Sequence, residues 1–353
     1  MANATSAVKE VNCSAGKNIT EVLSKAESGD TIQITGTCTE RLAITTDRLT
    51  LDGQGSATLN GGGSTGGSFA GVIEIQGARG VVIKGLTVQS GPNGLAASGG
   101  AAFYVRDSVF QNHAGSGMLI IGGSTGELTN CAMLKNGAGM NVLTGSTVVL
   151  KGAISANGNA GNGISIGGGS MLEIRGAVVQ ANNNMVVGVS LSGAQGAIWA
   201  FSEAQGSSIT ATGNAFAGLG IAEANLQSGG GSGPNTINVS NNGAFGFFLP
   251  IGGVIDSPFG SIQLMASGNP VGLYLGIGSR ALIHGGLTMQ HNKTGVLADG
   301  GDTLNLNASP APIPPAPSTI NGNEHGRRPP LRVACDLRKR RNDRCDKVRQ
   351  NGS

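Results

Sequence analysis

Two stretches of the chain, Asn136-Gly137-Ala138-Gly139-Met140-Asn141-Val142 and Asn159-Ala160-Gly161-Asn162-Gly163-Ile164-Ser165-Ile166, decide the fold. Each begins with Asn and reaches a Gly–apolar–any–apolar run a few residues later. The same unit occurs eight times in succession, at intervals of 23–30 residues, and starts at Asn112, Asn136, Asn159, Asn184, Asn214, Asn242, Asn269 and Asn292. Self-similarity at such a period is typical of a solenoid, in which each repeat forms one coil and stacks on the next.

The repeat predicts parallel strands that stack from coil to coil. A coil of about 23 residues holds two or three short strands, which bond to the next coil at a strand spacing of about 4.8 Å. The two apolar residues of each run then point inward, so we expect Met118, Val142, Ile166 and Leu191 to be buried. The Gly suits a close backbone approach. The Asn suits a left-handed turn, and stacked Asn amides are expected to bond from coil to coil.

Three parts of the chain follow from this pattern. Residues 1–30 are predicted to form an N-terminal cap with a short helix, since Asn18 and Glu21 have capping-box spacing and Gly29 suits a C-cap. Residues 31–323 form the β-helix, and residues 324–353 form a disordered basic tail. Residues 327–353 carry ten Lys and Arg against three Asp and Glu, whereas residues 1–326 carry 13 against 17.

The five cysteines match no zinc-binding pattern. Cys13 and Cys38 flank the predicted cap helix and one strand, so we expect a disulfide between them, the alternative being two small buried thiols. Cys131 lies in a strand-like run and is expected to pack in the core. The four His do not cluster, so the sequence predicts neither a metal site nor a cofactor.

The opening of the chain carries a resemblance to a known superfamily. The blocks Val11-Asn12-Cys13, Gly29-Asp30-Thr31-Ile32-Gln33-Ile34-Thr35-Gly36-Thr37-Cys38 and Leu49-Thr50-Leu51-Asp52-Gly53-Gln54-Gly55 resemble the first coils of bacterial β-helix repeat proteins. With the later repeats, they make residues 11–323 similar to the right-handed parallel β-helix superfamily that includes pectate lyases and polygalacturonases. That resemblance implies an all-β, right-handed parallel β-helix that binds or processes polysaccharide. Because the superfamily hosts many activities, a non-catalytic structural or adhesive solenoid is the alternative.

Candidate catalytic and binding residues lie on two outward faces. On the strands that follow Gly-Ser, Glu127 and Glu173 are candidates for an acid and base pair, the chemistry of a lyase or glycoside hydrolase. On the same face, Lys151 and Arg175 are candidates for binding an acidic polymer. The alternative for all four is a solvated surface of paired charges.

Aromatic residues supply further candidates for substrate binding. Phe248 and Tyr274 occupy the same outward position on adjacent coils, where they could hold a sugar or simply stabilise the sheet. The longest coils lie between Asn184 and Asn269, and their extra residues predict loops in which binding sites are commonly built. Trp199 and Glu203 lie in this region and complete the candidate binding residues.

Composition narrows the setting and the partners. The 62 glycines, 39% hydrophobic and 12% charged residues suit short strands joined by tight turns. No apolar run approaches the ~18 residues of a membrane span. Residues 1–10 lack the apolar core of a signal peptide, so either the protein is not exported or its leader lies outside this numbering. Secretion or display at the cell surface is the expected location. Polysaccharide is the expected partner; nucleic acid is not expected, because the basic tail lacks aromatic residues for stacking. The oligomeric state does not follow from the sequence.

Overall fold

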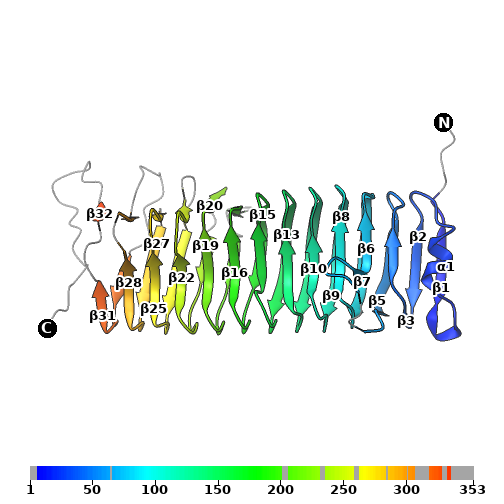
Figure 1. Cartoon of the computed structure of the whole chain (residues 1–353), viewed down its shortest axis with the longest axis horizontal. Coiled ribbons are helices and arrows are strands. Elements are labelled where there is room, and N and C mark those ends of the chain that lie inside the picture. The colour runs from blue at the N-terminus through cyan, green and yellow to red at the C-terminus, as the bar shows by residue number, and fades with distance from the viewer. Residues whose placement is uncertain are drawn as a thin grey trace. The chain divides into compact units, whose positions relative to one another are not determined.

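The computed structural model describes residues 6–63, 66–200, 206–230, 235–257, 262–283, 285–299, 301–306, 318–327 and 332–334. The chain divides into two compact units, Met1–Met171 and Leu172–Ser353. In both units, strands of successive coils lie side by side in parallel sheets (Figure 1). The predicted all-β parallel solenoid is therefore confirmed.

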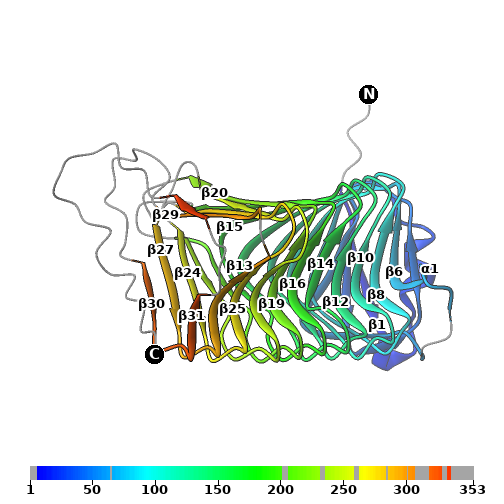
Figure 2. The same cartoon turned by 60° about the vertical axis from the view of Figure 1, so that its left-hand side comes forward.

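Unit 1 contains a short N-terminal cap and two parallel sheets. The cap consists of a 3-10 turn, η1 (Cys13–Ala15), and one helix, α1 (Ile19–Leu23). The repeat sheet and its N-terminal extension contain β4 (Leu42–Ile44), β6 (Gly71–Gln76), β8 (Asn93–Ser98), β10 (Ser116–Ile120), β12 (Ala138–Val142) and β14 (Ile164–Gly167). Figure 2 shows β6, β8, β10, β12 and β14 side by side in this sheet. The other sheet contains β1 (Val8–Asn12), β2 (Thr31–Thr35), β3 (Thr37–Thr39), β5 (Thr50–Asn60), β7 (Arg79–Gln89), β9 (Ala102–Gln111), β11 (Thr125–Leu134) and β13 (Thr147–Asn157).

Unit 2 repeats the same arrangement, with mostly shorter strands outside its repeat sheet. Its repeat sheet is formed by β16 (Val187–Ser192), β19 (Ala217–Ala222), β22 (Phe245–Leu249), β25 (Val271–Leu275), β28 (Thr294–Ala298) and β31 (His325–Arg327). The remaining strands are β15 (Met171–Gln180), β17 (Gln195–Ala200), β18 (Ser208–Thr210), β20 (Asn225–Gly230), β21 (Asn235–Asn238), β23 (Val254–Asp256), β24 (Ile262–Ser267), β26 (Arg280–Ile283), β27 (Gly285–Gln290), β29 (Thr303–Leu306), β30 (Thr319–Asn321) and β32 (Arg332–Ala334).

The predicted inward residues form the core of each unit. Met118 and Val142 are fully buried, and Ile166 and Leu191 are 1% exposed. In unit 1, Met118 pairs with Met140 and Ile120 with Val142, so like side chains stack from coil to coil. Leu119, which stands between the two inward positions of its run, is also buried, with 6% of its surface exposed; it pairs with Ala96 and Asn141 of the adjacent strands.

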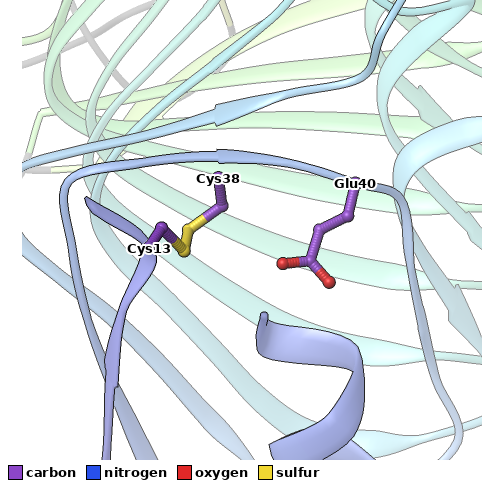
Figure 3. A group of neighbouring side chains, drawn as sticks. All are labelled: Cys13, Cys38 and Glu40. Carbon is purple, nitrogen blue, oxygen red and sulfur yellow. A yellow bond between two sulfur atoms is a disulfide. The ribbon is translucent and has the colours of Figure 1, made fainter. Parts of the chain in front are cut away.

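The N-terminal cap is pinned to the first coils by polar side chains and a disulfide. Cys13 and Cys38 form the predicted disulfide, with Cα atoms 5.2 Å apart. Both oxygens of the Glu40 carboxylate accept backbone N–H groups of the first turn of α1, from Ile19 at 2.7 Å and Thr20 at 2.8 Å (Figure 3). The Asn18 side chain caps the helix by accepting from the Glu21 N–H at 2.8 Å.

Helix α1 ends at Leu23, before the predicted C-cap at Gly29. The helix stops because Asp30, which is 3% exposed, holds the segment between Leu23 and Asp30 in a turn. Its carboxylate accepts the N–H groups of Ala7 and Glu27 and pairs with Lys9 at 2.7 Å. The hydrogen bond from Lys9, followed by the two backbone bonds, lowers the pKa of Asp30 to about 2.

Buried asparagines form the ladder that the repeat predicted. In unit 2, each of Asn184, Asn214, Asn242, Asn269 and Asn292 donates its backbone N–H to the side-chain oxygen of the next ladder residue, at 2.8–3.0 Å. In unit 1 the chain of bonds runs from His113 to Asn136 and from Asn136 to Asn159. Because these groups are buried, the ladder supplies bonds that water cannot.

The first ladder member is His113, not Asn112, which corrects the repeat assignment. Asn112 lies in the turn with φ 57°. The His113 ring substitutes for an amide: Nδ1 accepts from the Gly91 N–H at 3.1 Å, and Nε2 lies 3.1 Å from the Val88 oxygen. Asn136 makes the equivalent pair of contacts, accepting from His113 and donating to the Phe110 oxygen.

The beginning of the expected tail takes part in strand pairing. β31 pairs with β28, and β32 pairs with β29, so the parallel arrangement extends beyond residue 323. Residues 335–353 lie outside the described residues, and their disorder stays a prediction. Across the described part of the chain, the one helix is neither long nor apolar enough to span a bilayer.

Candidate functional site

The predicted acidic and basic candidates occur as ion pairs within their own units. In unit 1, Lys151 Nζ lies 2.8 Å from Glu127 Oε2, across the β11–β13 pairing. In unit 2, Arg175 pairs with Glu173 on the same strand. An ion pair that is partly open to solvent contributes about 0–1 kcal/mol.

The structure adds two cations to the face that carries Lys151. The strand register places Lys84, Arg106, Thr129 and Lys151 in one row across β7, β9, β11 and β13. Lys84 pairs with Asp52 at 2.9 Å, and the Arg106 guanidinium lies 5.9 Å from the centre of the Tyr104 ring. Two of the three cations therefore have an acidic partner, and the row carries a small excess of positive charge.

The repeat sheet of unit 2 carries an aromatic cluster on its outer side. The register pairs Phe248 of β22 with Tyr274 of β25, as the repeat predicted. Their rings stack with centres 5.5 Å apart and an interplanar angle of 18°. Both side chains are half-buried, so each ring keeps part of its surface open.

Two further rings, which were not among the residues predicted from the repeat, complete this cluster. Phe216 precedes β19, is 36% exposed, and lies edge-on to Phe248 with ring centres 5.1 Å apart. Phe245 begins β22 and lies 4.6 Å from Phe248 and 5.5 Å from Tyr274. The available signal was their position two or three residues after ladder asparagines on adjacent coils. We call Phe216, Phe245, Phe248 and Tyr274 the aromatic cluster.

One carboxylate is attached to the aromatic cluster. The Tyr274 hydroxyl donates to Asp299, a contact that raises the pKa of Tyr274 to about 12, with burial as the next cause. The phenol therefore stays protonated near neutral pH. Asp299 is held in turn, because its N–H donates to Asp302 at 3.1 Å and Asp302 accepts the Ser279 N–H at 3.3 Å.

The remaining candidates do not add to either face. Only the backbone of Trp199 is described, paired with Gly229 in β20, and Glu203 lies outside the described residues. Cys131 is 2% exposed, and burial raises the pKa of its thiol to about 12, which suits a packed core residue.

Two other clusters contain polar groups that are already bonded within the fold. An open cavity of about 400 Å³ in unit 1 is lined by residues that include Ser90, His113 and Lys135, but both ring nitrogens of His113 are occupied by the ladder. Cys13, Cys38 and Glu40 have ligand atoms within 4.8 Å of one another. There the sulfurs form the disulfide, and the carboxylate binds the first turn of α1.

Comparison with known proteins gives the same fold. The family model for the right-handed β-helix region matches residues 51–216. Among solved structures, the A-module of a mannuronan C-5 epimerase of Azotobacter vinelandii is 15% identical, with a TM-score of 0.50, covering 88% of this chain and 93% of that one. A second epimerase A-module of that organism is 16% identical, with a TM-score of 0.49 and coverage of 88% and 82%. No curated protein sequence matches the chain.

The stacked parallel coils and the family match define the class of this chain: it is a right-handed parallel β-helix protein. At this level of identity, the structural likeness speaks to the fold and not to the activity.

Proposed function

We propose that this protein binds polysaccharide, and that the aromatic cluster of unit 2 is its binding surface. The observation that carries the proposal is the stack of Phe248 and Tyr274, joined by the exposed ring of Phe216 on the outer side of the repeat sheet. Aromatic rings offer large apolar contact area together with a polar group on Tyr. Sugar rings have matching apolar C–H faces surrounded by hydroxyls.

The arrangement of the charged side chains supports a binding function better than a catalytic one. A lyase or hydrolase needs a carboxyl or other base free to exchange a proton with its substrate. Glu127 and Glu173, the predicted acid and base, are each paired with a cation, and Asp299 accepts the Tyr274 hydroxyl. A purely structural role for the rings, as a ladder that stabilises the sheet, is the competing function.

The charged face of unit 1 supports a second candidate, the binding of an acidic polysaccharide. Lys151, predicted for this role together with Arg175, shares its row with Lys84 and Arg106. Cations on neighbouring coils suit the repeated carboxylates of an acidic polymer, but the ion pairs to Asp52 and Glu127 compete with such a ligand.

A secreted or cell-surface location is part of the proposal. The Cys13–Cys38 disulfide supports it, because disulfides persist mainly in oxidising compartments.

Affinity electrophoresis and calorimetry with a panel of neutral and acidic polysaccharides test the proposal. We expect the Phe248→Ala plus Tyr274→Ala variant to bind at least tenfold more weakly, about 1.4 kcal/mol. Phe69→Ala, which removes a ring of unit 1 that is 67% exposed, is the matched control. Reducing ends and unsaturated products are measured in the same samples, because product formation by the native protein would show chemistry as well as binding.

A further inference from the structure

We infer that the aromatic cluster selects an uncharged polysaccharide, whose chain runs from coil to coil across the strands of unit 2. The inference rests on the proposed function and adds the class of the ligand and the direction of its chain relative to the strands. It follows from three features of the described surface: the absence of cations from its central row, its continuity along the coils, and the position of Asp299.

The central row of the surface is uncharged. The strand register places Ser190, Gly220, Phe248, Tyr274 and Leu297 in one line across β16, β19, β22, β25 and β28. A uronate polymer needs cations to offset the cost of desolvating its carboxylates. Instead, the charged group bonded to the cluster is the Asp299 carboxylate, which would repel an anionic chain.

The apolar surface is continuous along the coil direction. One coil before Phe216 lie Met185 and Val186, which are 67% and 41% exposed. The Phe216 N–H donates to the Val186 oxygen at 2.9 Å, so these residues are direct neighbours on adjacent coils. Exposed or half-buried apolar side chains therefore extend across four successive coils, from Val186 through Phe216 and Phe248 to Tyr274, at a spacing of about 4.8 Å per coil.

This geometry sets the direction of an extended ligand. A chain lying along one strand would meet the rings of a single coil, whereas a chain lying across the strands meets those of several coils. Contiguous exposed apolar surface of this kind marks an interaction site rather than ordinary protein surface. A linear polymer lying across the stacked strands would therefore meet the same kind of contact on each coil.

At one end of the surface, the Asp299 carboxylate can orient a bound glycan by accepting hydrogen bonds from its hydroxyls. Its carboxylate accepts from the Tyr274 hydroxyl and still has acceptor capacity, because an ionised carboxylate has about four lone-pair sites. Sugar hydroxyls are donors and can use the remaining sites. A neutral glycan therefore gains a charge-assisted hydrogen bond at the same position where an acidic glycan meets repulsion.

Calorimetry with neutral and uronic-acid oligosaccharides, each at low and high salt, tests the inference. We expect a neutral oligosaccharide to bind with an affinity that changes less than twofold between 50 and about 500 mM salt, since no ion pair forms. Phe216→Ala should weaken that binding at least fivefold, and Asp299→Asn at least threefold. Phe216 is already exposed, so its replacement tests binding without removing a core residue; melting curves verify folding.

The alternative outcomes separate the inference from the proposed function. Selective binding of uronic-acid oligosaccharides, with loss at high salt and a gain in Asp299→Asn, would overturn the inference and leave polysaccharide binding intact. Failure of the native protein to bind any polysaccharide would overturn both. Concentration-dependent self-association that Phe216→Ala abolishes, without glycan binding, would assign the surface to a second copy of the chain.

Discussion

The two units solve the same packing problem and present different outer surfaces. Inside each, aliphatic residues stack from coil to coil, as Ile166 does in unit 1 and Ile221 in unit 2. Outside, unit 1 carries ion pairs such as Lys151–Glu127, and unit 2 carries the aromatic cluster. Inner positions are constrained by close packing, while outer positions are free to acquire a ligand-binding function.

The polar ladders of the two units differ in one residue. In unit 2 the described ladder consists of asparagines, whereas in unit 1 it reaches His113. An amide keeps its donor and acceptor at every pH, but an imidazole loses its acceptor when it is protonated. Among the ladder residues that the structure describes, His113 of unit 1 is therefore the one whose hydrogen bonding depends on pH.

The largest expected effect comes from charging the shared interior. Ile166→Asp in unit 1 and Ile221→Asp in unit 2 each bury an unpaired carboxylate and should lower the free energy of unfolding by about 4 kcal/mol or more. Urea denaturation measures this. The neighbouring outward residues supply controls, Ser165→Asp and Ser190→Asp, for which we expect losses below about 1 kcal/mol. An unchanged midpoint for either Ile variant would contradict the assignment of that position to the core.

Removing a ladder amide should have the next largest effect. Asn214→Ala deletes the acceptor for the Asn184 N–H and leaves that group buried without it, at a cost of about 1–3 kcal/mol. His113→Asn in unit 1 is the matched substitution that keeps both an acceptor and a donor, and it should cost less than Asn214→Ala at pH 7. Equal losses in the two variants would contradict this expectation, because they would show that Asn does not replace the hydrogen bonds of His113.

The pH dependence of stability should separate the two ladders. Burial lowers the pKa of His113 from 6.5 to about 4, against two hydrogen bonds to the backbone. A lowered pKa means that the unfolded chain binds the proton more tightly. Stability is therefore complete above about pH 6.5 and falls as the pH drops toward 4, by up to about 1.4 kcal/mol per pH unit.

Melting of the native protein and of His113→Asn between pH 7 and pH 4 measures this effect. The variant should lose less stability on acidification, because asparagine does not titrate. Parallel pH profiles for the two proteins would show that His113 is not the responsible group. Comparing the two pH profiles removes the contribution of the carboxylates, which both proteins share.

The smallest expected effect concerns the ion pairs of unit 1. Lys151→Ala should change the free energy of unfolding by less than about 1 kcal/mol, because the pair with Glu127 is partly exposed. Double-mutant cycles with Glu127→Gln at low and high salt give the coupling. A coupling well above 1 kcal/mol would show that the charged face of unit 1 is structural, and would weaken its candidacy for acidic ligands.

Several structural features could be predicted from local sequence. The Asn–Gly–apolar unit returns often enough to require stacked coils, so the core positions, the asparagine ladder and the neighbouring positions of Phe248 and Tyr274 were all foreseen. The Cys13–Cys38 disulfide was also foreseen, because the segment between them is short and folds back as a cap. These features depend on residues that repeat or lie close together along the chain.

Other features required the register between distant residues. The repeat pointed to Asn112, but only the stacking of coils shows that the buried ring of His113 occupies the ladder. The cap helix stops early because Asp30 bonds to Ala7 and Lys9, which precede it by more than 20 residues. Side-chain hydrogen bonds of this kind outweigh the local helix signal near Gly29.

The sequence by itself determined that this chain is a β-helix and which side chains fill it, since burial and period fix those positions. Only the tertiary structure decided which outer residues meet. It joined Phe216 and Phe245 to the predicted rings, attached Asp299 to Tyr274, and set Lys84 and Arg106 beside the row of Lys151. Outer positions carry no packing period, and their neighbours come from adjacent coils more than 20 residues away, so their chemistry emerges only when the coils are stacked in register.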